Sequence, residues 1–97
     1  MRALLFDQHG PVENLHLVAD YPVPEPGAGE VRIRVRTAAL NRLDLCVRNG
    51  LPNLKLPLPH IPCADAAGDV DKVGEGVTGW NPGDRAAFDP SLSCGHC

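Results

Sequence analysis

The cysteines are the first residues in this sequence whose type and spacing suggest chemistry. Cys94 and Cys97 enclose two residues in the terminal run Cys94-Gly95-His96-Cys97. Two thiols at this spacing form either a redox-active dithiol or two of the thiolates of a zinc site. No secretory signal is expected from the short apolar run at residues 3–6, so a metal-binding or structural role is expected to outrank a set of disulfides.

A second group with chemical potential lies in the run Asn41-Arg42-Leu43-Asp44 and at Arg48. Asn41 with Asp44 three residues later is a loose capping box for a short helix that stops at Gly50. The Asn41 amide is also a candidate hydrogen-bond donor to a substrate, and one residue can fill both roles. Asp44 is expected either to cap the helix or to pair with Arg48 one turn later. Arg48 either points toward a cofactor or substrate or is a solvated helix residue.

A third combination, His60 with Cys63 and Cys46, is a weaker candidate for a metal site. Cys46 lies five residues past Asn41, which is about 140° around the helix, and His60 follows a proline-rich segment. Cys63 is instead expected to pack as a small buried side chain.

The elements that position these residues are predicted to be short strands, turns and one helix. Ten glycines and ten prolines in 97 residues interrupt long helices but fit a chain of strands and turns. Strands are predicted at 2–7, 15–20, 31–37, 64–73 and 84–88, a helix at 42–48, and an irregular surface loop at 51–62. This pattern favours a mainly β domain, specifically a small, partly open β-barrel with one short helix.

The clearest strand begins at Val31 and has a period of two. Val31, Ile33, Val35 and Thr37 alternate with arginines at 32, 34 and 36. The apolar side is expected to face the core and the arginine side to face water.

Composition excludes several classes of function. Apolar residues make up 43% of the chain and charged residues 22%, as in soluble globular proteins. A net charge of −3 gives no basic surface for nucleic acid. The apolar run at residues 3–6 is too short for a signal peptide or a membrane span, so a cytoplasmic protein without a membrane partner is expected.

Three motifs resemble the medium-chain dehydrogenase/reductase superfamily, which includes the zinc-type alcohol dehydrogenases and quinone oxidoreductases. The strongest motif is the run Gly68-Asp69-Val70-Asp71-Lys72-Val73-Gly74-Glu75-Gly76-Val77-Thr78-Gly79-Trp80-Asn81-Pro82-Gly83-Asp84-Arg85. The others are Pro24-x-Pro26-x-x-Gly29-Glu30-Val31 and Ala38-Ala39-Leu40-Asn41-x-x-Asp44-x-x-x-Arg48-x-Gly50. Together they cover nearly the whole chain and imply the GroES-like catalytic domain of that superfamily. The glycines in the turns of the strongest motif are expected to adopt positive φ or to allow two backbone segments to approach closely. They are not expected to bind phosphate.

The resemblance also locates the positions of a catalytic zinc and shows that its ligands differ here. In the zinc enzymes a cysteine stands at the position of Asn41, and the histidine of a G-H-E-x-x-G motif stands at Ala64. A catalytic zinc needs about three protein ligands. The resemblance therefore implies the zinc-independent branch, in which nicotinamide transfers hydride to or from a carbonyl, enone or quinone. In that branch Asn41 is the first candidate to donate to the substrate oxygen or to hold the nicotinamide.

The resemblance gives further expectations about cofactors and organisation. Cys94 and Cys97 match the first two of four ligands of a structural zinc, so residues 1–97 are expected to be a domain incomplete at its C-terminus. NAD or NADP is expected to bind a separate Rossmann domain that these residues lack, and a homo-oligomer is expected for the longer parent. Residues 1–97 alone are then expected to be inactive and to hold zinc weakly.

Two other functions remain open from the sequence. A free-standing GroES-like binding or assembly module would share the fold without the enzyme activity. A thiol oxidoreductase is the third, because Cys94-Gly95-His96-Cys97 is identical to the active-site tetrapeptide of protein disulfide isomerases. No strand and helix of a thioredoxin-like unit is predicted around it, which counts against this function.

Overall fold

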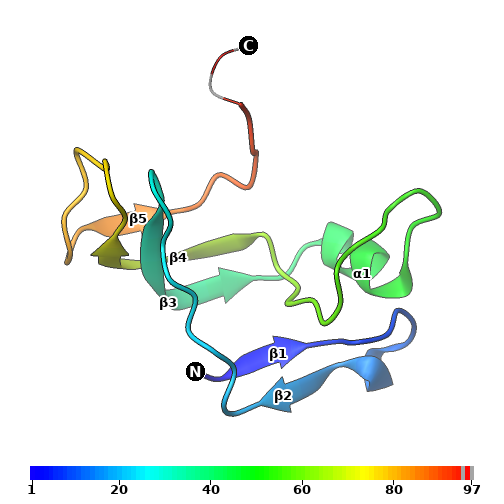
Figure 1. Ribbon diagram of the computed structural model, residues 1–97. Coiled ribbons are helices and arrows are strands. Elements are labelled where there is room, and N and C mark those ends of the chain that lie inside the picture. Colours follow the sequence, from blue (N-terminus) through cyan, green and yellow to red (C-terminus); the bar gives the residue numbers. More distant parts are fainter. Residues whose placement is uncertain (95, 97) are drawn as a thin grey trace. The chain divides into compact units, whose positions relative to one another are not determined.

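The computed structural model describes residues 1–94 and 96, which divide into two compact units. The first unit comprises residues 1–24 and 40–63, and the second comprises residues 25–39 and those from Ala64 on. The elements are β1 (Ala3–Leu5), a 3₁₀ helix (Val12–Asn14), β2 (His16–Val18), β3 (Val31–Ala39), α1 (Arg42–Asn49), β4 (Asp65–Val73) and β5 (Arg85–Ala87) (Figure 1). The prediction of a mainly β chain with one short helix is confirmed for the described residues.

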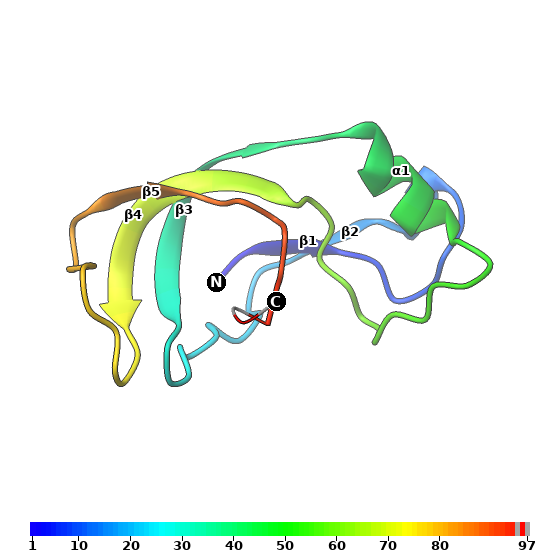
Figure 2. The same ribbon diagram turned by 90° about the horizontal axis from the view of Figure 1, so that it is seen from above.

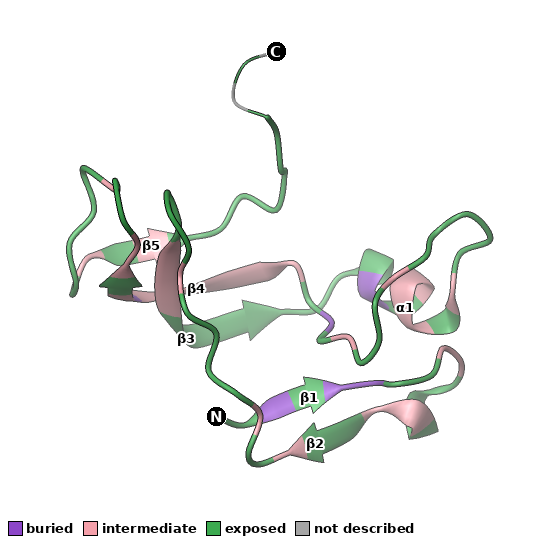
Figure 3. Ribbon diagram, viewed as in Figure 1, coloured by how far each residue is buried: buried purple, intermediate pink, exposed green. Residues whose placement is uncertain are grey.

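The core of the first unit lies along β1 and the residue that follows it. β1 pairs antiparallel with β2, and it alternates buried Ala3 and Leu5 with exposed Leu4. Phe6 is 0% exposed, and its backbone exchanges hydrogen bonds of 3.0 and 2.9 Å with His60. The rings of His9 and His60 lie 5.4 and 5.5 Å from the Phe6 ring. Figure 3 shows these buried residues along β1.

Helix α1 begins and ends where the sequence predicted, within one residue. Asn41 is the N-cap, with extended backbone angles, and Gly50 follows the last helical residue with φ of 97°. A positive φ is accessible to glycine at little cost, and the Gly50 N–H donates to the carbonyl of Cys46 at 2.9 Å. Residues 51–62 contain no helix or strand, which confirms the predicted loop.

The second unit contains one three-stranded antiparallel sheet in the order β3-β4-β5. Figure 2 shows the three strands side by side. β5 follows the turn-rich segment 74–83, in which Gly76, Gly79 and Gly83 have positive φ. Gly74 serves close approach instead, because a side chain there would overlap the carbonyl oxygen of Gly27. Both roles agree with the sequence prediction.

The prediction of a buried apolar face on β3 is only partly correct. Val31 and Ile33 are half-buried, but Val35 is 52% exposed and Thr37 is also exposed. Two register shifts, at Arg32/Ile33 and at Val35/Thr37, interrupt the regular alternation. The described residues of this unit also contain no second layer that could cover the apolar face.

Two of the three arginines of β3, Arg34 and Arg36, are solvated as predicted, whereas the Arg32 side chain is only 20% exposed. All three are paired with carboxylates of β4. Arg32 and Arg34 lie 2.8 and 3.7 Å from the carboxylate of Asp71, and Arg36 lies 2.8 Å from that of Asp69. None of these ion pairs joins register partners. The register places Arg34 opposite Asp69 and Arg32 opposite Lys72, while Asp71 and Arg36 stand at the two register shifts, so the long arginine side chains reach their carboxylates diagonally. Among the described residues, no helix has the length and apolar character needed to cross a membrane.

Candidate functional site

Asp44 is the buried charged residue around which the candidate site is built. It is 8% exposed and lies in the first turn of α1. Its Oδ2 accepts a hydrogen bond from the backbone N–H of Asn41 at 2.7 Å, and its Oδ1 accepts one from the backbone N–H of Cys63 at 3.0 Å. A carboxylate is electrostatically favourable at a helix N-terminus, which offsets part of the cost of burying it. One side chain therefore connects the start of α1 to the residue two positions before β4.

These contacts decide between the two roles expected for Asp44. The capping box with Asn41 is present. The expected alternative, an ion pair with Arg48, is not among the ion pairs formed within residues 1–94 and 96. Both carboxylate oxygens instead accept hydrogen bonds from backbone N–H groups. A neutral side chain at this position would accept these hydrogen bonds less strongly.

Asn41 is exposed at the N-terminal end of α1. Its backbone N–H is bound by Asp44, so its position relative to the helix is fixed. Its role as a helix cap and its predicted role toward a substrate are compatible, because a cap uses the amide oxygen and a substrate carbonyl would use the amide N–H groups.

Arg48 is half-buried, and its side chain is held by hydrogen bonds to Gly10 and Asn49. Its Nε donates to the carbonyl oxygen of Gly10 at 3.2 Å, and the Gly10 N–H donates back to the carbonyl of Arg48 at 2.9 Å. A longer contact of 3.4 Å joins its Nη2 to Oδ1 of Asn49. Arg48 therefore attaches the C-terminal end of α1 to the turn after β1, a contact that neither of its two expected roles included.

Cys63 differs from its prediction as a small buried side chain. It is exposed, and it is the one non-glycine residue with positive φ, 83°, among the described residues. The physical reason is its place in the turn into β4, where Asp44 fixes its amide. Cys63 stands where the resembling motif has the glycine of G-H-E-x-x-G, a residue that adopts this φ freely. Desolvation, followed by the negative charge of Asp44, raises the pKa of the Cys63 thiol.

The structure gives little support to the third combination of metal-binding residues. Among residues 1–94 and 96, no group of three or more His, Cys, Asp or Glu side chains is arranged to hold a metal ion. Cys46 is partly buried in α1, while Cys63 is exposed. The His60 ring lies against Phe6.

Only half of the terminal cysteine pair can be placed. Cys94 is exposed in the extended segment after β5, and its Sγ accepts a hydrogen bond from the backbone N–H of His96 at 3.4 Å. Cys97 lies outside the described residues. The predictions for this pair, structural zinc or redox dithiol, therefore remain predictions.

Sequence reasoning missed the two long-range contacts that organise this site. Asp44 reaches Cys63 across 19 positions, and Arg48 reaches Gly10 across 38. The capping-box spacing pointed to Asp44 but gave no signal for its second partner, since that bond goes to a backbone amide.

Comparison with known proteins gives a consistent result. Residues 27–97 match the family described as the alcohol dehydrogenase GroES-like domain. Quinone oxidoreductase of Rattus norvegicus is 34% identical over 96 residues, which is 99% of this chain and 29% of that protein.

Solved structures of the same kind agree with the fold. An NAD-dependent alcohol dehydrogenase has a TM-score of 0.92 and 54% identity over all of this chain and 28% of its own. The quinone oxidoreductase of Escherichia coli, solved with NADPH, has a TM-score of 0.82 and 32% identity over 91% of this chain and 26% of its own. This chain thus spans little more than a quarter of the length of the proteins it matches.

Proposed function

Because this chain belongs to the alcohol dehydrogenase GroES-like domain family, we propose that it is the substrate-binding, catalytic domain of a nicotinamide-dependent oxidoreductase. The proposed reaction is hydride transfer between NAD or NADP and a small carbonyl, enone or quinone substrate. The match over 27–97 and the quinone oxidoreductase and alcohol dehydrogenase relatives support it. The nicotinamide, when bound, supplies or accepts the hydride, and a separate Rossmann domain of the whole protein would bind most of that cofactor.

We propose further that the substrate site works without a catalytic zinc. The observation that carries this proposal is the pair of residue types at the two ligand positions, Asn41 and Ala64. A methyl group cannot bind zinc, and an amide is not among the usual zinc ligands. A hydrogen-bond donor must then polarise the substrate carbonyl in place of a metal.

In this proposal the N-cap of α1 and two residues within the helix have different roles. The exposed Asn41 amide donates to the substrate oxygen, and Asp44 positions Asn41 through the 2.7 Å bond to its backbone. Arg48 is the second candidate for contact with cofactor or substrate. Its bonds to Gly10 and Asn49 use Nε and one N–H of Nη2, and a guanidinium has further N–H groups for that contact.

The test for Asn41 separates its capping role from its donor role. Asp caps a helix as well as Asn does but has no N–H group to donate, so Asn41→Asp should leave stability within about 0.5 kcal/mol while Asn41→Ala loses about 1 kcal/mol. With the complete product of the gene, kcat/KM for a quinone or enone should fall about 100-fold in both variants. Gln8→Glu, an exposed amide-to-carboxylate change outside α1, is the charge-matched control. An Asn41→Asp enzyme with unchanged kcat/KM would refute the donor role.

Metal analysis tests the zinc proposals. Cys94 and Cys97 are proposed as two of four ligands of a structural zinc in the whole protein. The complete enzyme should then hold about one zinc per chain and lose it in Cys94→Ser. Two zinc ions per chain would refute the zinc-free substrate site, and none would refute the structural site.

A further inference from the structure

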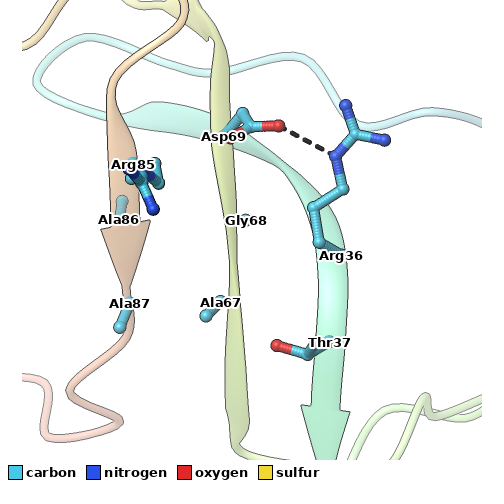
Figure 4. Close-up of a pocket in the computed structure, with 8 residues that line it drawn as sticks. All are labelled: Arg36, Thr37, Ala67, Gly68, Asp69, Arg85, Ala86 and Ala87. Carbon is cyan, nitrogen blue, oxygen red and sulfur yellow. Dashed lines mark hydrogen bonds and ion pairs between the residues drawn. The ribbon is translucent and has the colours of Figure 1, made fainter.

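One face of the β3-β4-β5 sheet contains a hollow that the proposed function does not use. It has a volume of about 570 Å³ and lies in the second unit. Figure 4 shows Arg36 on β3 and Arg85 on β5, on either side of the central strand β4. Its lining residues are Arg36, Thr37, Ala67, Gly68, Asp69, Arg85, Ala86 and Ala87.

The strand register explains why short side chains lie beside Arg85, whereas Arg36 lies at the register shift between Val35 and Thr37. Asp69 is the register partner of Arg85, and Ala67 is the partner of both Thr37 and Ala87. Register partners in antiparallel strands project from the same face. A row of short side chains therefore lies beside a row of long charged ones, and the methyl groups form the floor.

The charges of the hollow do not cancel. The Asp69 carboxylate is paired with Arg36, whose Nε lies 2.8 Å from Oδ2. Arg85 is exposed and belongs to no ion pair of the described residues. The hollow therefore carries one excess positive charge, although the net charge of the whole chain is −3.

The donors in and beside the hollow suit a tetrahedral anion. A guanidinium presents a planar fork of N–H groups that can bind two oxygens of a phosphate at once. The Thr37 hydroxyl is a further donor on the opposite strand, and the Ala67 and Ala87 methyl groups offer no competing acceptor. The volume exceeds that of a phosphate ion, so it leaves room above this floor for a small organic group.

We propose that this hollow binds a phosphate group, either inorganic phosphate or the phosphate of a small monoester. Arg85 is the principal ligand, while Arg36 and Thr37 are secondary ligands. The Asp69 carboxylate opposes the anion and weakens its binding, because it also holds Arg36.

The test is a titration of the protein with inorganic phosphate and with phenyl phosphate at constant ionic strength, followed by NMR of the Gly68 and Ala87 amides. Saturable shifts are expected. Arg85→Gln should weaken binding about tenfold, the usual effect of losing one hydrogen bond to a charged group. Asp69→Asn should strengthen it by a similar factor. Tighter binding of phenyl phosphate would identify the monoester as the ligand class, and equal binding would identify free phosphate.

A matched control decides whether any binding is specific to the hollow. Arg42→Gln removes the same charge from the exposed first residue of α1, outside the hollow, and should leave the affinity unchanged. Equal weakening by Arg42→Gln and Arg85→Gln would mean an adventitious ion only and would overturn the proposal. A lack of saturable binding at millimolar phosphate would also overturn it. None of these readouts depends on oxidoreductase activity.

Discussion

The two units of this chain are stabilised in different ways. The first unit contains the buried side chains Ala3, Leu5, Phe6 and Asp44, whereas Val70 is the one buried hydrophobic residue of the described part of the second. The second unit relies on the backbone ladder of its sheet and on solvent-exposed ion pairs, which individually contribute little. Substitutions of side chains should therefore be costly in the first unit, while the second should be sensitive mainly to strand spacing.

The largest effect is expected from Phe6→Ala. Phe6 is fully buried, and truncating such a ring typically costs about 4 kcal/mol through lost burial and the cavity left behind. Urea denaturation measures the loss, and amide hydrogen exchange should locate it in the first unit. Leu4→Ala, one strand position from the buried Leu5 and 43% exposed, is the control and should cost less than about 1 kcal/mol.

Gly68→Ala tests the dependence of the second unit on strand spacing. A Cβ at Gly68 would overlap the backbone carbonyl oxygen of Arg34 on the neighbouring strand, so the strands must separate. We expect a loss of about 3 kcal/mol in free energy of unfolding, at the upper end for overpacking. The control is Ala86→Gly, which removes a methyl group from the register partner of Gly68 instead of adding one to Gly68. If Gly68→Ala cost no more than this control, strand spacing would not be the limiting feature.

A smaller effect of opposite sign is expected from Cys63→Gly. The φ of 83° is unfavourable for any residue with a Cβ, and glycine removes a penalty of about 1 kcal/mol. Thermal and urea unfolding should both show the gain. Cys63→Ala keeps the Cβ while removing the thiol, so it should give no stabilisation. An equal gain from alanine would trace the effect to the sulfur rather than to the backbone.

The smallest effect is expected at the exposed ion pairs of the second unit. The hydrogen bond and charge of Lys72, together with Arg32, lower the pKa of Glu25 below its ordinary value. A lowered folded-state pKa adds stability at pH values above the ordinary carboxyl pKa, and that stability is lost as pH falls through the lowered pKa. Lys72→Gln should raise the Glu25 pKa in an NMR titration with little change in stability, whereas Lys55→Gln in the first unit should leave it unchanged.

Features encoded by neighbouring residues were predictable from the sequence. The Asn41 cap and the Gly50 stop gave the limits of α1 within one residue, and the Gly/Pro turns indicated where the strands lie. The limits of the strands were less accurate, because β1 and β2 are half as long as predicted and β3 continues to Ala39. Features that depend on distant residues were not predictable. The register shifts on β3 and the Asp44 bond to Cys63 arise only when separate segments meet. Cys63 was predicted to be buried from its residue type alone. Residue type carries no information on the backbone angles of the turn in which Cys63 is exposed.

The candidate site shows the same division between features that the sequence predicts and features that depend on distant residues. Asn41 and Ala64 were located through the resemblance to a known family, which the family match supports, whereas their roles in a reaction remain proposals. Neither the attachment of Arg48 to Gly10 nor the hollow beside Arg85 had a sequence signal, since both depend on residues far apart in the chain.

The bond from Asp44 to Cys63 also bears on how this domain can be redesigned. It closes the segment between α1 and the turn into β4 into a loop whose ends are joined by a buried carboxylate. The entropic cost of closing a loop between two fixed ends depends only weakly on the length of the loop. Residues 51–57, which precede the bridge between His60 and Phe6, can therefore be regarded as an exchangeable cassette. Variants of different length and sequence can be grafted there, and selected for new substrates of the proposed enzyme, while the anchoring residues at each end are retained.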